Sequence, residues 1–202
     1  MSTDWVAEPG ERLVTEWDRD VPSDDTLVRA YVDAFAEMVE AIARAAGGRV
    51  HRDDTVLLGD AAAPGAYLNG AVLLAPLAEA SASEIVARAH GFFGGEPGGP
   101  WILFSATPTP DLRPYGLEPV GHPPLMLRPA GGTRRPPPDD LEVVAVGDSE
   151  TLRVFERTVI DAYPMPEMRD SPAGVLMPDA VLDDDSLRLY LGLVDGEPVG
   201  TS

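Results

Sequence analysis

Few side chains in this sequence combine a reactive type with a spacing that could do chemistry. The three histidines, His51, His90 and His122, are far apart along the chain, and none has a second metal-ligating residue at helical or strand spacing. Metal sites need three or four converging ligands, so we expect no metal site. The chain has no cysteine, which excludes disulfides, thiol nucleophiles and thiolate metal sites.

Two loops look like ion-binding motifs at first sight. The acidic triplet 183–185 could attract a hard cation, but adjacent residues in a loop point apart, and we interpret it as a solvated turn. The glycine-rich stretch 94–99 follows a predicted helix instead of preceding one, so the helix end nearest to it carries negative partial charge. A phosphate loop needs the opposite order, and we interpret this stretch as an ordinary flexible loop.

Composition restricts the partners. The 202 residues include 34 acidic and 15 basic side chains, for a net charge of −19, and 44% of the residues are hydrophobic. Such a chain can bury a core, but its surface repels nucleic acid and anionic lipid. The N-terminus lacks the pattern of an export signal, and proline and glycine interrupt the uncharged stretch 61–78, so we expect a cytoplasmic protein.

The first part of the chain alternates helices and strands. A helix start signal lies at Pro22 to Asp25, and apolar residues then recur at spacings of three and four until Gly47. Ser81 and Glu84 form a capping box, which predicts a helix from Ser81 to about Phe93. The strands predicted for this part are 55–59, 70–75, 101–105 and a short one at 124–127.

A linker rich in glycine, arginine and proline spans residues 131–140, and it predicts a domain boundary between residues 1–130 and residues 141–202. The pattern then restarts with a strand at 141–146. A helix follows, capped by Asp148 or Ser149, whose apolar stripe is Leu152, Phe155, Val159 and Ala162. Prolines interrupt the chain after Tyr163.

The end of the sequence predicts a β-hairpin. Leucines alternate with other residues over 187–194, and Asp195-Gly196 then forms a tight turn into a strand over 197–202. The order of strand, helix, proline-broken loop, alternating strand, Asp-Gly turn and a strand containing Pro-Val-Gly resembles the N-terminal part of a GNAT acetyltransferase domain. The stretch 191–200, Leu-Gly-Leu-Val-Asp-Gly-Glu-Pro-Val-Gly, carries most of the similarity, which covers residues 141–202.

This resemblance implies an α/β (α+β) fold with a mixed GNAT-like sheet flanked by helices, in two units of which the second is incomplete. It implies an N-acyltransferase that passes acetyl from acetyl-CoA, its co-substrate, to a small-molecule or peptide amine. In that family an Arg/Gln-x-x-Gly-x-Gly/Ala loop at a helix start holds the pyrophosphate of acetyl-CoA. That motif is missing from residues 1–202, so no catalytic or cofactor-binding residue is assigned.

The loop after the first helix helps to wall the acceptor pocket in enzymes of this family. Here it contains Tyr163, Met165, Glu167 and Met168, which are the candidate pocket residues, although Met and Tyr also fill gaps between elements.

Residues 23–128 resemble a degenerate second copy of the same fold. The segment 76–80, which leads into the helix predicted at Ser81, has no glycine and no arginine, and it carries Glu79, which would repel a pyrophosphate. We therefore expect that this part does not bind CoA as the family does. The alternative function is a non-catalytic module that binds a ligand or serves regulation or dimerisation. In the case of dimerisation, the partner is a second copy of the chain.

Overall fold

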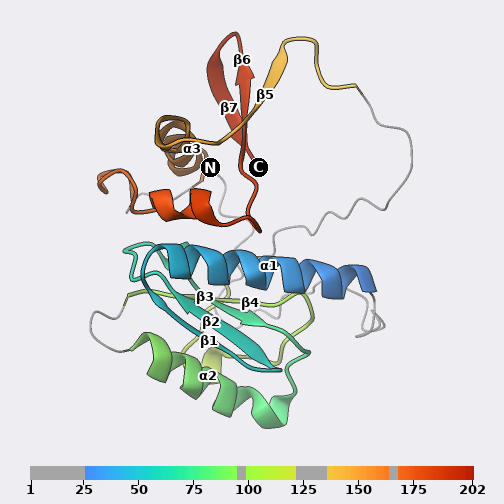
Figure 1. Ribbon diagram of the computed structural model, residues 1–202. Coiled ribbons are helices and arrows are strands. Elements are labelled where there is room, and N and C mark those ends of the chain that lie inside the picture. Colours follow the sequence, from blue (N-terminus) through green and yellow to red (C-terminus); the bar gives the residue numbers. More distant parts are fainter. Residues whose placement is uncertain (1–25, 95–98, 122–135, 164–167) are drawn as a thin grey trace.

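The computed structural model describes residues 26–94, 99–121, 136–163 and 168–202 (Figure 1). Within these residues the fold is α+β, with three α-helices, a mixed four-stranded sheet and a separate three-stranded antiparallel sheet. We call residues 26–121 the first unit and residues 136–202 the second unit. The predicted fold class is confirmed at this level.

The first unit builds the mixed sheet. Its elements are α1 (Thr26–Ala45), β1 (Arg49–Arg52), β2 (Val56–Asp60), β3 (Asn69–Leu73), α2 (Glu79–Phe93) and β4 (Ile102–Phe104). The strand order is β1-β2-β3-β4, in which β3 and β4 are parallel and the other pairs are antiparallel. The parallel pair requires a crossover, and α2 provides it.

Helices α1 and α2 cover opposite faces of this sheet (Figure 1). Successive side chains of a strand point to opposite faces, so neighbouring residues of β2 enter different cores. Leu57 packs with Val39 of α1, whereas Leu58 packs with Ile85 of α2. All five residues of β2 and of β3 are buried, as expected for strands with a helix on each side.

Some predicted boundaries of the first unit are wrong. Helix α2 begins at Glu79 with Ala78 as its N-cap, and no side chain caps it. The Ser81 hydroxyl donates to the carbonyl of Ala78 from inside the first turn, so the capping box does not form. Strand β1 was not predicted, because its sequence Arg-Val-His-Arg is mostly polar and exposed at a sheet edge. The helix start signal at 22–25 and the strand predicted at 124–127 lie outside the described residues.

The second unit contains β5 (Leu141–Ala145), α3 (Ser149–Ala162), the short 3-10 helix η4 (Asp179–Asp183), β6 (Tyr190–Val194) and β7 (Glu197–Thr201). Its sheet has the order β5-β6-β7 with antiparallel pairs. The predicted hairpin is confirmed, since Asp195 and Gly196 both have positive φ values, 51° and 79°. Turns of this kind match the twist of the strands that they join.

The β5-β6-β7 sheet is covered unevenly. Leu191 is 3% exposed, while Val143 and Tyr190 are 60% and 41% exposed. The register pairs Val143 with Gly192 and Ala145 with Tyr190, so Val143 and Tyr190 lie on the face opposite to Leu191. Within the described residues, one face of this sheet therefore leaves apolar side chains open to solvent.

The two units share a hydrophobic core, which we call the joint core. It consists of Ile42, Ala63 and Leu68 from the first unit with Ile160, Met168 and Leu176 from the second. Helix α1 also contacts η4, which lies along it in Figure 1. The predicted boundary at 131–140 separates two distinct sheets, but the units on either side of it pack together.

In the residues that the structure describes, no helix is long and apolar enough to cross a membrane.

Replacing Leu58 by Ala should destabilise the protein by about 2–5 kcal/mol, because Leu58 is 1% exposed between the sheet and α2 and the cavity left behind cannot collapse fully. Urea denaturation measures the change. Val120→Ala is the control: Val120 is 49% exposed, and its truncation should change the free energy of unfolding by less than about 0.5 kcal/mol. Equal effects of the two variants would contradict the described core.

Candidate functional site

The second unit's polar network begins at the N-terminus of α3. Asp148 is the N-cap, and its carboxylate accepts hydrogen bonds from the Thr151 backbone N–H at 2.8 Å and from the Thr151 hydroxyl at 2.9 Å. These bonds favour the charged carboxylate and lower the pKa of Asp148 below its ordinary value. The predicted cap is thus confirmed as Asp148, and Ser149 instead donates to Asp179 at 3.0 Å.

Glu156 is the buried centre of this network, with 3% of its surface exposed. Its carboxylate accepts from the backbone N–H groups of Gly174, Leu176 and Met177 at 2.7, 2.9 and 3.2 Å. Arg153, one helical turn earlier, donates to it at 2.8 Å. A buried carboxylate is costly unless it is paired and hydrogen-bonded, and this one has both kinds of partner.

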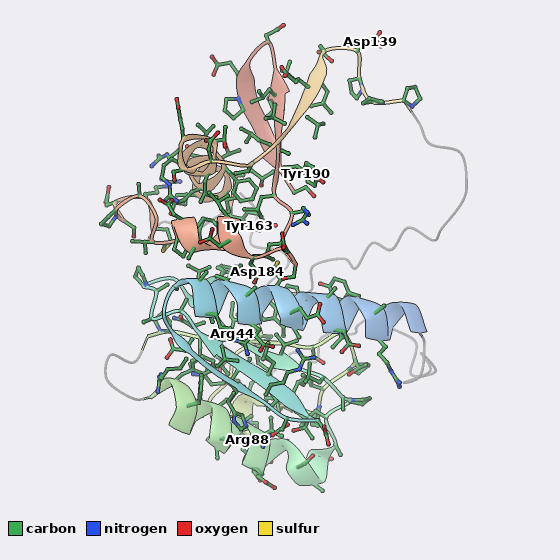
Figure 2. All side chains as sticks on the ribbon, viewed as in Figure 1. Arg44, Arg88, Asp139, Tyr163, Asp184 and Tyr190 are labelled. Carbon is green, nitrogen blue, oxygen red and sulfur yellow. The ribbon has the colours of Figure 1, made fainter. Side chains whose placement is uncertain are left out.

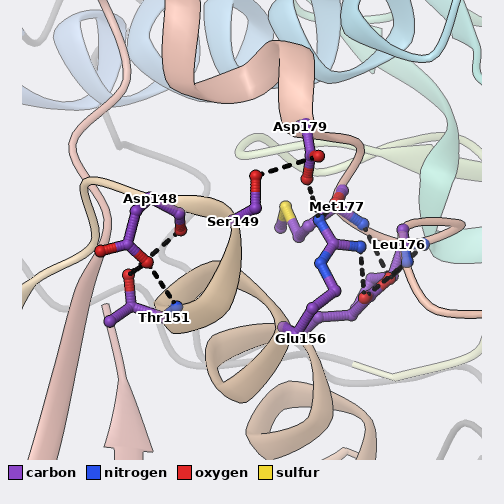
Figure 3. A network of polar contacts seen from close by, with 9 residues as sticks. Asp148, Ser149, Thr151, Glu156, Leu176, Met177 and Asp179 are labelled. Atoms are coloured by element: carbon purple, nitrogen blue, oxygen red, sulfur yellow. Dashed lines mark hydrogen bonds and ion pairs between the residues drawn. The ribbon is translucent and has the colours of Figure 1, made fainter.

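Arg153 joins α3 to the segment that precedes η4. Its guanidinium donates to Glu156, to the carbonyl of Met177 and to Asp179, the last at 2.8 Å (Figure 3). Gly174 has φ 89°, and a Cβ there would lie 2.7 Å from an Arg153 nitrogen. The backbone conformation therefore favours glycine at this position, and a Cβ would displace the Arg153 guanidinium from its present place.

Sequence reasoning missed Glu156, although a signal was present. Glu156 lies four residues after Leu152 and four before Ile160, both of which are buried in the same helix. A carboxylate at that spacing must lie on the apolar face of an amphipathic helix, where it needs buried donors. The donors come from a loop about twenty residues later, which the spacing does not reveal.

A shallow trough of about 610 Å³ lies between the outer face of α3 and β7. Its floor is mostly apolar, and its charged groups are Arg153, Arg157 and Asp161. Arg157 donates to both carboxylate oxygens of Asp161, at 2.8 and 2.9 Å, so these two charges largely satisfy each other. The trough offers a mixed surface without a reactive pair.

The two candidate pocket residues that the structure describes lie in different surroundings. Tyr163 follows α3 and is 58% exposed, whereas Met168 is 0% exposed in the joint core. Met165 and Glu167 lie outside the described residues. Neither Tyr163 nor Met168 lines the trough. Their role in an acceptor pocket therefore stays a prediction.

Three of the other sequence candidates have partners among the described residues. His51 lies 3.5 Å from a carboxylate oxygen of Asp53, and His90 packs edge-on against Trp101. Asp184 accepts from Ser186 within its own turn. Among the described residues, no group of three or more His, Asp or Glu side chains is arranged to hold a metal ion. His122 and residues 95–98 of the glycine-rich loop lie outside this range.

The start of α2 is the place in the first unit where a strand leads into a helix through a short loop. Its N-cap Ala78 provides no side-chain hydrogen bond, and Glu79 puts a carboxylate in the first helical turn. A helix N-terminus attracts anions through its free amides. A carboxylate in the first turn neutralises that partial positive charge and repels a phosphate.

Comparison with protein-family models, with curated proteins and with solved structures gives no match for this chain.

The cap at Asp148 should make stability depend on pH. Its pKa is lowered in the folded state, so its contribution is complete above the ordinary aspartate pKa of about 4 and is lost as the pH falls through the lower folded value. Asp148→Asn keeps an acceptor oxygen but cannot titrate. We expect the urea midpoint of the parent chain to fall more steeply than that of this variant between pH 5 and pH 3.

Asp139→Asn is the control for this experiment, because Asp139 is exposed and precedes β5 outside any helix cap. It should follow the parent curve. Parallel curves for the parent and Asp148→Asn would show that the cap carboxylate adds nothing beyond an ordinary acceptor.

Proposed function

We propose that the chain belongs to an N-acyltransferase of the GNAT type, which transfers acetyl from acetyl-CoA to a small-molecule or peptide amine. The observation that supports this most is the order of elements in the second unit. Strand β5, helix α3, an irregular loop, strand β6, a tight Asp195-Gly196 turn and strand β7 follow one another as the resemblance implies. In this family catalysis depends on positioning the amine and polarising the thioester carbonyl.

The first unit supports the same proposal in a weaker way. Its strands β2 and β3 form an antiparallel pair, and β3 leads through α2 to the parallel strand β4. This arrangement is compatible with a degenerate copy of the same fold. For this unit alone we favour the non-catalytic role, because Glu79 occupies the helix start where a pyrophosphate would have to sit.

The acyltransferase proposal is tested with the protein isolated from its native cells. Release of free CoA thiol is measured with acetyl-CoA and a panel of primary amines, and acceptor-dependent release is the expected result. If the protein does not bind acetyl-CoA and releases no thiol with any amine of a broad panel, the non-catalytic module becomes the better interpretation.

The 202-residue chain by itself should not bind acetyl-CoA. It lacks the Arg/Gln-x-x-Gly-x-Gly/Ala motif, and the described helix start after a strand carries Ala78 and Glu79 instead. Isothermal titration calorimetry with acetyl-CoA should give no saturable heat, while a GNAT enzyme titrated in the same buffer gives a full binding curve. Micromolar binding by the chain would place a cofactor site within these residues.

A further inference from the structure

The contact between the two units depends on a loop without regular structure. From the second unit, Met168 and Leu176 enter the joint core together with Ile160 of α3. Met168 is 0% exposed and Leu176 is 2% exposed, so both side chains are fully enclosed. Between them the backbone-to-backbone hydrogen bonds are local turn bonds, such as Val175 N–H to the carbonyl of Pro172, and side chains of α3 supply the other hydrogen bonds to the backbone.

Among the side chains of α3, Glu156 makes the most hydrogen bonds to this loop, while Arg153 and Arg157 each donate to one of its carbonyls. Three backbone N–H groups of the loop, at Gly174, Leu176 and Met177, converge on Glu156. Glu156 accepts from the Leu176 amide, and its helix α3 also contributes Ile160 to the joint core. Leu176 therefore bonds to α3 through its amide while its side chain enters the joint core.

We propose that Glu156 is a positioning residue for the association of the two units. It holds the 168–177 loop in the conformation in which Met168 and Leu176 fit against Ile42 and Leu68 of the first unit. The interaction surface is the joint core, and its partner is the first unit of the same chain.

The energetics favour this assignment over a purely local role. Without the carboxylate, three amides and one bond of Arg153 lose their acceptor in a buried place, and leaving buried donors unsatisfied is costly. Arg153 still keeps Asp179 and the carbonyl of Met177, so the loop gains freedom while α3 stays formed. The Leu176 amide is the buried one of the three, so we expect it to regain water when Leu176 withdraws from the joint core.

The first unit does not need this contact to stay folded. Its two other cores, one on each side of the mixed sheet, contain no residue of the second unit. Loss of Glu156 should therefore separate the units without unfolding the mixed sheet.

The absence of cysteine from the full chain makes a distance measurement straightforward. Ser83 on α2 and Glu150 on α3 are both exposed, and Ser83→Cys with Glu150→Cys provides one spin label in each unit. Pulsed electron spin resonance should give one narrow distance peak in this parent chain. Adding Glu156→Ala should remove the narrow peak and leave a broad distribution, while hydrogen exchange shows the β2 and β3 amides still protected.

Three further variants make the result specific. Leu176→Asp puts a charge directly into the joint core and should give the same broad distribution. Asp161→Ala removes an exposed carboxylate of α3. It accepts from Arg157 but from no loop amide, so this variant should keep the narrow peak. Glu156→Gln retains one acceptor oxygen and should lose less of the narrow peak than Glu156→Ala.

A narrow peak that survives Glu156→Ala would overturn the proposal. So would loss of protection in β2 and β3, because the first unit would then depend on Glu156 for its own folding. A Glu156→Gln variant as broad as Glu156→Ala would show that the acceptor oxygens are not the cause.

Discussion

The second unit depends on the joint core. Residues 136–202 supply three short strands and one long helix, and a unit of that size buries too little apolar surface to be stable with ease on its own. It gains the missing burial by placing Ile160, Met168 and Leu176 against the first unit. The two sheets remain separate, but the protein has a continuous apolar region between them.

The irregular loop that enters the joint core has backbone amides without partners in a helix or sheet, and buried amides need hydrogen-bond acceptors. Helix α3 provides one in Glu156, whose charge is balanced by Arg153. Arg153 in turn extends the network to Asp179 at the start of η4, the short helix that contacts α1 (Figure 3). Polar and apolar contacts thus fix the same segment from its two sides.

The polar groups of this protein are mostly used to hold its elements together. Figure 2 shows Arg88 on α2 in the first unit, where it donates to Asp53 at 2.6 Å and to the Thr55 hydroxyl at 2.9 Å. Hydrogen bonds from Thr55, with the nearby charge of Arg88, lower the pKa of Asp53. The bonds of Arg88 tie the turn between β1 and β2 to the helix beneath the sheet. In the trough beside α3, Arg157 and Asp161 are likewise paired with each other.

The sequence by itself determined the elements whose signals are local. Helix α3 and the Asp195-Gly196 turn follow from side-chain spacing and turn chemistry within a few residues, and the structure contains both. The predicted stripe of α3 is right for Leu152 and Phe155, but Ala162 is exposed and Ile160 is buried instead. The sequence allowed Asp148 or Ser149 as the cap, and the structure selects Asp148. The start of α2 was misjudged because Ser81 has two local hydrogen-bonding options, and its hydroxyl bonds the carbonyl of Ala78 instead of capping the helix. Only the tertiary structure decided that Glu156 is satisfied by residues 174–177 and that Met168 is buried against α1, since both depend on contacts between segments far apart in the chain.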